Sequence, residues 1–96
     1  MANYIVLTNF TDQGIRTVTE SVKRARLSQS TFEKYGCKKT AQFWTIGQHD
    51  IVTVLEAPND ETAMKAVLAV GKLGNVRTVT MRAFTAAEME ALTSEL

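Results

Sequence analysis

The sequence predicts an α+β fold in which strands and helices follow one another in the order β-α-β-β-α-β, with one more helix near the end of the chain. Four short runs rich in β-branched and aromatic residues are bounded by turn residues. Between them, two longer stretches repeat apolar residues every three to four positions, as amphipathic helices do. This order is the split β-α-β arrangement, an antiparallel sheet in the spatial order 4-1-3-2 with both helices on one face.

The first strand spans residues 3–10, and the turn-forming residues TDQG follow it. A helix then runs to about residue 35. We expect an irregular turn over residues 12–20, with Ser21 capping the main helix and Gly36 ending it in the left-handed conformation. The apolar residues that follow a helical spacing here are Ile15, Val18, Val22, Ala25 and Phe32.

The second strand spans residues 38–46 and the third spans residues 50–57, so a tight turn at Gly47 and Gln48 joins them. Asp50 is the second residue after this turn. Aspartate side chains commonly accept hydrogen bonds from turn amides, so we expect Gly47 and Asp50 to have structural roles there.

The second helix spans residues 59–74, with Asn59 or Asp60 as its N-cap. The fourth strand follows over residues 75–84. Small residues on the buried stripe of this helix would let it lie close to the sheet. That stripe consists of Ala63, Ala66, Val67, Val70 and Leu73.

The last helix begins at a capping box from Thr85 to Glu88 and carries Met89, Leu92 and Leu96 on one side. It is an addition to the ferredoxin-like core that the order of elements predicts. We expect it to cover a sheet edge or to reach a partner subunit.

The two strands expected at the centre of the sheet are apolar on both faces. Ile5 and Leu7 lie on one face, Tyr4 and Val6 lie on the other, and residues 50–57 repeat this pattern. A strand with one wet face would alternate apolar with polar residues. Because two helices cover only one face, we expect an obligate homo-oligomer of dimers packed sheet face to sheet face.

The stretches FWTIGQHDIVTVLEAPNDETA and LGNVRTVTMRAF, together with YIVLTNFTDQGIR near the start, resemble the GYD-domain family from Tyr4 to Phe84. His49 stands in place of the tyrosine that gives the family its name. The resemblance implies a dimeric α/β barrel of bacterial type and no established reaction. At TIGQHDIV the chain is also similar to effector domains of leucine-responsive-type regulators, which bind small ligands at subunit contacts. Small cofactor-independent monooxygenases share the fold and use a pocket between sheet and helices.

Length and composition are those of one globular domain over residues 1–96, with 45% hydrophobic and 22% charged residues. The net charge of +1 says nothing about partners, but the lack of a domain-wide basic field argues against nucleic-acid binding. No apolar run is long enough to cross a membrane, and no signal peptide is recognisable. A single cysteine, Cys37, favours the reducing cytoplasm. No cysteine, histidine or acidic cluster predicts a metal site, and no motif predicts a cofactor.

The candidate ligand-binding residues are Trp44, His49, Arg77 and Arg82, which offer an aromatic surface and basic groups on an otherwise apolar sheet. By strand alternation, Arg77 and Arg82 lie on opposite faces. The commoner role of a tryptophan such as Trp44 is packing in a core or an interface, and that of a lone histidine such as His49 is an ordinary exposed or packed side chain. His49 and Asp50 are adjacent in sequence and should therefore point apart.

Asp12 and Arg16, in the stretch TDQGIR, could stand at the mouth of a pocket, although plain turn formation is the alternative. We therefore expect a small homo-oligomeric domain that binds a small polar or anionic metabolite at a sheet-face or subunit-interface pocket. The alternative is a cofactor-independent enzyme, monooxygenase-like or isomerase-like, with a pocket between sheet and helices. The residues decide neither for nor against catalysis.

Overall fold

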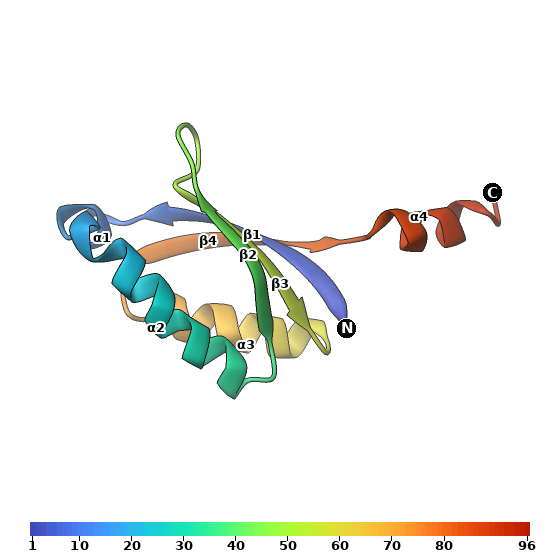
Figure 1. Ribbon diagram of the computed structural model, residues 1–96, viewed down its shortest axis with the longest axis horizontal. Helices are drawn as coiled ribbons and strands as arrows, with labels where there is room; N and C mark the ends of the chain where they lie inside the picture. Colours follow the sequence, from blue (N-terminus) through green and yellow to red (C-terminus); the bar gives the residue numbers. More distant parts are fainter.

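A four-stranded antiparallel sheet in the order β2-β3-β1-β4 forms one layer, and helices α2 and α3 form a second layer on one of its faces (Figure 1). The computed structural model describes residues 1–96. It confirms the ferredoxin-like α+β fold and the predicted strand order, read from the opposite edge. The elements are β1 (Ala2–Phe10), α1 (Asp12–Arg16), a 3-10 turn η1 (Val18–Glu20), α2 (Ser21–Lys34), β2 (Lys38–Trp44), β3 (Ile51–Ala57), α3 (Asp60–Gly71), β4 (Val76–Ala83) and α4 (Ala86–Thr93).

The start of α2 differs from the prediction. The segment before it is irregular, as expected, but the Ser21 side chain does not cap the helix. Ser21 is the first residue of α2 and is buried, and its hydroxyl accepts a hydrogen bond from the Trp44 indole at 2.9 Å. The Ser21 hydroxyl therefore bonds to β2 and not to the amides of its own helix. Gly36 has a φ of +75° after the helix, the left-handed conformation that was predicted.

The hairpin between β2 and β3 is longer than predicted. β2 ends at Trp44 and not at residue 46, because Ile46 is fully exposed and has no partner strand. The Thr45 amide donates to the Asp50 carbonyl at 2.8 Å and closes a loop around Gly47, whose φ is +128°. The turn therefore spans residues 45–50, not only Gly47 and Gln48.

Helix α3 is capped by Asn59, whose side chain accepts from the Thr62 amide at 2.9 Å. The helix ends at Gly71, three residues before the predicted end. Ala63, Ala66 and Val67 are buried as the stripe predicts. Leu73 is not buried, with 64% of its surface exposed, because it lies beyond the end of the helix.

The hydrophobic core occupies one end of the two-layer structure, where α3 begins and α2 ends. Its helix residues come from the last turns of α2 and the first turns of α3. The first half of α2 contributes no apolar residue to this core, since Val22 is 48% exposed. The nine core residues are Tyr4, Val6, Phe32, Cys37, Leu55, Ala57, Ala63, Ala66 and Val67.

The other face of the sheet carries no helix (Figure 1). Strand register places apolar side chains from all four strands on it, because residues paired across strands share a face. Phe43, Val79 and Met81 are 64%, 57% and 43% exposed there. We call this surface the open face; its apolar residues are Ile5, Leu7, Ala41, Phe43, Val52, Val54, Val79 and Met81.

Helix α4 stands away from the rest of the molecule, beyond the end of β4 (Figure 1). Its N-terminus has the predicted capping box, with Thr85 accepting from the Glu88 amide at 3.1 Å and Glu88 accepting from the Thr85 amide at 2.8 Å. None of its residues is buried. No helix in the structure is both long enough and apolar enough to span a membrane.

Gly14 provides a direct test of how α1 packs. The α1 segment docks on the loop after α3, and a β-carbon on Gly14 would lie 1.9 Å from the Asn75 carbonyl oxygen. Because that oxygen belongs to the backbone, Gly14→Ala should lower the free energy of unfolding by about 1–3 kcal/mol. The measurement is chemical denaturation followed by circular dichroism.

Gly71→Ala is the matched control. Gly71 is the last residue of α3, and a β-carbon there meets nothing within 4 Å. It should raise stability by roughly 0.5–1 kcal/mol, since alanine loses less backbone entropy. Equal stability of the two variants would contradict the packing described for α1.

Candidate functional site

A cavity of about 400 Å³ lies between the sheet and helices α2 and α3, at the end of the molecule that the core leaves unfilled. Val6 and Phe32 separate it from the core, and Asn75 lies at its other end. This volume is in the range of small-molecule binding sites in proteins. The cavity is therefore the principal candidate site.

The floor of the cavity carries one polar side chain from each strand of the sheet: Thr8, Gln42, Thr53 and Thr78. Thr8 pairs with Thr78 across β1 and β4, and Gln42 pairs with Thr53 across β2 and β3. Thr8 and Thr53 are 6% and 4% exposed. These four residues were not among those predicted from the sequence, although threonine in the helix-facing register of apolar strands is a signal that could have found them.

The Gln42 amide group connects the floor to Lys39, a half-buried lysine. Its nitrogen donates to the Thr53 hydroxyl at 3.2 Å, and its oxygen accepts from Lys39 Nζ at 2.9 Å. Lys39 also donates to the Ala25 carbonyl at 2.9 Å. A register shift between Lys39 and Ala41 puts the side chains of Lys39 and Gln42 on the same side of the sheet, the side that the helices cover. Burial lowers the pKa of Lys39, because it disfavours the charged ammonium.

The walls of the cavity come from the two helices and are mostly apolar. Val67 and Val70 of α3 face Ala25 and Ser28 of α2 across the cavity. Arg24 contributes the only charged side chain. Its guanidinium already donates to the carbonyls of Thr17 at 3.0 Å and Gly14 at 3.2 Å, so it is held in place by backbone acceptors.

The lining of the cavity contains no aspartate, glutamate, histidine, cysteine, lysine or tyrosine. General acid–base and nucleophilic catalysis use these residue types, with serine or threonine activated by a neighbouring base. No base stands beside the hydroxyls here. The arrangement therefore offers hydrogen bonds and apolar surface to a bound molecule.

Four sequence-predicted residues lie outside this cavity and are not gathered in one place. Trp44 is on β2, at one edge of the sheet, and its indole bonds to Ser21. Arg77 and Arg82 are on β4, at the other edge, with Arg77 on the open face and Arg82 on the helix side. His49 lies in the hairpin loop. The structure does not bring Trp44, His49, Arg77 and Arg82 into a common pocket.

The hairpin corner is held to β1 by side chains. The Asp50 carboxylate accepts from the Phe10 amide at 2.8 Å, so its amide partner is on the neighbouring strand and not in the turn itself. Asn9 donates to the Gln48 carbonyl at 2.8 Å, and its oxygen lies 2.9 Å from His49 Nδ1. His49 and Asp50 thus bond to successive residues of β1 and not to each other.

Asp12 and Arg16 are the first and last residues of α1. Asp12 lies in the first turn and Arg16 in the last turn, positions that favour the interaction of each charge with the helix dipole. Both side chains are exposed, and neither lines the cavity.

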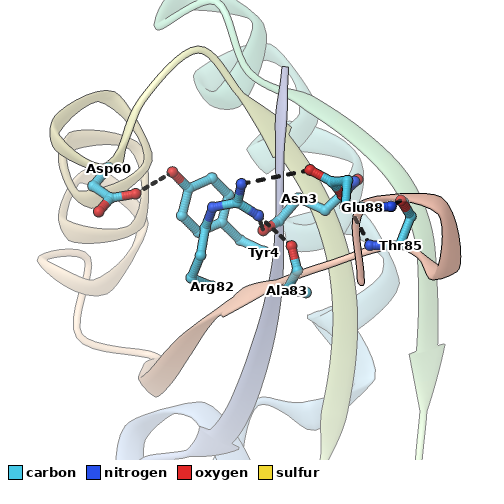
Figure 2. A network of polar contacts seen from close by, with 7 residues as sticks. All are labelled: Asn3, Tyr4, Asp60, Arg82, Ala83, Thr85 and Glu88. Atoms are coloured by element: carbon cyan, nitrogen blue, oxygen red, sulfur yellow. Dashed lines mark hydrogen bonds and ion pairs between the residues drawn. The ribbon is translucent and has the colours of Figure 1, made fainter. Parts of the chain in front are cut away.

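A polar network joins β1, α3 and β4 at the far end of the sheet (Figure 2). The Tyr4 hydroxyl donates to the Asp60 carboxylate at 2.5 Å. Arg82 lies with its guanidinium 5.7 Å from the centre of the Tyr4 ring and 4.5 Å from that of Phe84. It donates to the Asn3 carbonyl at 3.2 Å and to the Ala83 carbonyl, and it lies 3.8 Å from the Glu88 carboxylate.

The network changes the titration of two groups. Burial raises the pKa of Tyr4 to about 12, with the hydrogen bond to Asp60 as the second cause of the increase. Hydrogen bonds to the backbone and side chain of Thr85 lower the pKa of Glu88. Arg82 therefore interacts with an ionised Glu88 and a neutral Tyr4 at neutral pH. The network fixes the end of β4 from which α4 departs.

The fold and these features define a ferredoxin-like α+β domain with one helix-covered sheet face and one open face. The chain belongs to the GYD-domain family, because the model of the GYD domain matches residues 4–93. This agrees with the resemblance of the sequence motifs.

Among known proteins, the chain is 32% identical over 92 residues to one from Thermus thermophilus named glutamine synthetase and cystathionine beta-lyase binding protein. The match covers 95% of this chain and 97% of that protein. Two solved structures share the fold. FFRP-DM1 matches with a TM-score of 0.59 at 16% identity, over 88% of this chain and all of that one. TTHA0845 of Thermus thermophilus matches with a TM-score of 0.58 at 19% identity, over 90% of this chain and 96% of that one.

The burial of Tyr4 and its hydrogen bond to Asp60 should make the free energy of unfolding depend on pH in the alkaline range. Because Tyr4 releases its proton less readily in the folded protein, the folded state loses stability as pH rises from 10 through about 12. Tyr4→Phe should remove this part of the pH dependence and lower the free energy of unfolding at neutral pH by about 1–2 kcal/mol. Denaturation at a series of pH values measures both effects.

Tyr35→Phe is the control, since Tyr35 is the second tyrosine and is only half-buried. It should retain the alkaline loss of stability. If Tyr4→Phe retained it as well, the buried Tyr4 hydroxyl would not be its source.

Proposed function

We propose that the protein is a homo-oligomeric binding module without catalytic activity, in which two copies pack through their open faces. The observation that carries this proposal is the open face itself. Eight apolar side chains from all four strands lie on one uncovered surface. Soluble monomers rarely expose apolar patches of several hundred Å². A second copy presents the same surface, as a two-fold interface requires.

Three observations support binding in preference to an enzymatic function. The cavity holds no acid–base pair and no activated nucleophile. The residues His49 and Asp50, which could have formed such a pair, bond separately to β1. The Thermus relative is named as a protein that binds two enzymes, so other proteins are a reasonable class of partner for the module.

The cavity supports a small-molecule ligand as a second part of this function. Its floor offers hydroxyl and amide groups, its walls are apolar, and its one charged group is already hydrogen-bonded. A fitting ligand has an apolar body with an uncharged polar group that reaches Thr8 and Thr53. This differs from the anionic metabolite that the arginines favoured, because neither Arg77 nor Arg82 lines the cavity.

The state of the cysteine fits an intracellular setting for this module. Cys37 is free and buried, and burial raises the pKa of its thiol. A buried neutral thiol is unreactive and persists in a reducing compartment. We therefore place the protein in the cytoplasm.

The dimer is tested by adding a charge to the open face. Val79→Asp puts a carboxylate beside Leu7, its partner on β1. Sedimentation velocity at low micromolar concentration should show the parent as a dimer or larger and this variant as a species of lower mass than the parent, since the open-face contact is lost. The reason is that an ionised carboxylate in an apolar interface loses its hydration without gaining a partner.

Thr80→Asp is the matched control, because Thr80 is the next residue of β4, is exposed and lies on the opposite face. It should sediment like the parent. A parent protein that is monomeric and stable at this concentration would contradict the proposal.

The cavity is tested by a thermal-shift screen of small alcohols, amides and quinones. At saturation, a ligand that binds only the folded state should raise the unfolding midpoint by several degrees. Ser28→Leu fills the cavity from α2 and should abolish the shift. Ser30→Leu, on the exposed side of the same helix, should retain it. A shift that survives Ser28→Leu would place the ligand elsewhere.

A further inference from the structure

Helix α4 lacks the packing that stabilises short helices. It has eight residues, Ala86–Thr93, none of them buried, and it projects beyond the sheet (Figure 1). Isolated helices shorter than about 12–15 residues are marginal in water. The capping box at Thr85 and Glu88 helps its first turn only. A helix in this position needs a surface to pack on.

The side chains of α4 and the residues after it are apolar and acidic. Met89, Leu92 and Leu96 follow a helical spacing and are 53%, 54% and 102% exposed. The acidic residues are Glu88, Glu90 and Glu95, and no basic residue lies between residues 86 and 96. We call residues 86–96 the arm.

A surface of the opposite character lies at the other end of the molecule, on α1, η1 and the start of α2 (Figure 1). Ile15 on α1, Val18 on η1 and Val22 on α2 are 51%, 43% and 48% exposed there. The acceptor surface consists of these three residues with the basic Arg16, Lys23 and Arg26.

Neither set of charges is paired within the chain. The one ion pair in the structure joins Arg82 to Glu88, so Glu90 and Glu95 of the arm have no cationic partner. The basic residues of the acceptor surface have no acidic partner either. Lys23 lies in the first turn of α2, where the positive end of the helix dipole disfavours a cation. An acidic partner at this place would relieve that repulsion.

We infer that the arm of one copy docks on the acceptor surface of a second copy. The arm and the surface lie at opposite ends of one molecule, so they do not meet within a chain (Figure 1). Docking would bury the apolar stripe of the arm against Ile15, Val18 and Val22, and would bring its glutamates to Lys23 and Arg26. This interface is separate from the open face, and it would link dimers into a larger assembly.

Carbodiimide cross-linking tests the contact directly, because it joins a carboxylate to a lysine only when the two side chains touch. Lys23 is the one lysine of the acceptor surface. An equal mixture of ¹⁵N-labelled and unlabelled full-length protein, unfolded and refolded together, should give links from Glu90 or Glu95 to Lys23. These links should include mixed-isotope pairs. Absence of the link, or a link to Lys65 or Lys72 at α3 instead, would overturn the inference.

Three variants test this interface and separate it from the open face. Leu92→Asp should lower the yield of the mixed-isotope link about tenfold, as expected from losing one buried leucine. Ala87→Asp, on the other side of the arm, should leave the yield unchanged. Val79→Asp disrupts the open face and should also leave it unchanged, whereas equal yields with Leu92→Asp and Ala87→Asp would exclude docking through the apolar stripe.

Discussion

The structure depends on one constraint: two helices cover one face of a sheet whose central strands are apolar on both faces. The helix side of β1 carries Tyr4 and Val6, and the other side carries Ile5 and Leu7. In so small a domain, the buried apolar area is limited, and a large share of the available apolar surface remains on the open face. Both the position of the core and the proposed self-association are consequences of this division.

Most of the fold could be predicted because each element has a local signal. Glycines at positions 36 and 74 follow the helices, and the capping box opens α4 where it was expected. The predictions failed where tertiary contacts replaced local ones. Ser21 bonds to Trp44 instead of capping its helix, and Ile46 leaves β2 because no strand pairs with it. A propensity cannot reveal which distant partner a side chain finds.

The candidate site was harder to predict for a physical reason. Trp44 and Arg77 were predicted to bind a ligand because one is aromatic and the other basic, yet the strand order puts them at opposite edges of the sheet. The cavity instead depends on threonines and a glutamine, whose types are common on any surface. It also depends on how far α2 rises from the sheet, which helical periodicity does not encode. A cavity forms where no side chain fills the space between elements, whereas a sequence pattern describes only the side chains that are present.

Because the core lies at one end of the domain, the free energy of local opening should be higher at that end than at the end with the cavity. The end with Phe32, Leu55 and Ala66 can expose its amides only by near-global unfolding, because these residues connect both helices to the sheet. The end with α1 and the first half of α2 contains no residue of this core, and the hydrogen bonds that hold it to the rest of the fold include those from Thr11 to the Gly74 carbonyl and from Trp44 to Ser21. Amide hydrogens should therefore exchange faster at this end. Local opening of this end alone would admit a molecule to the cavity while the rest of the fold stays intact.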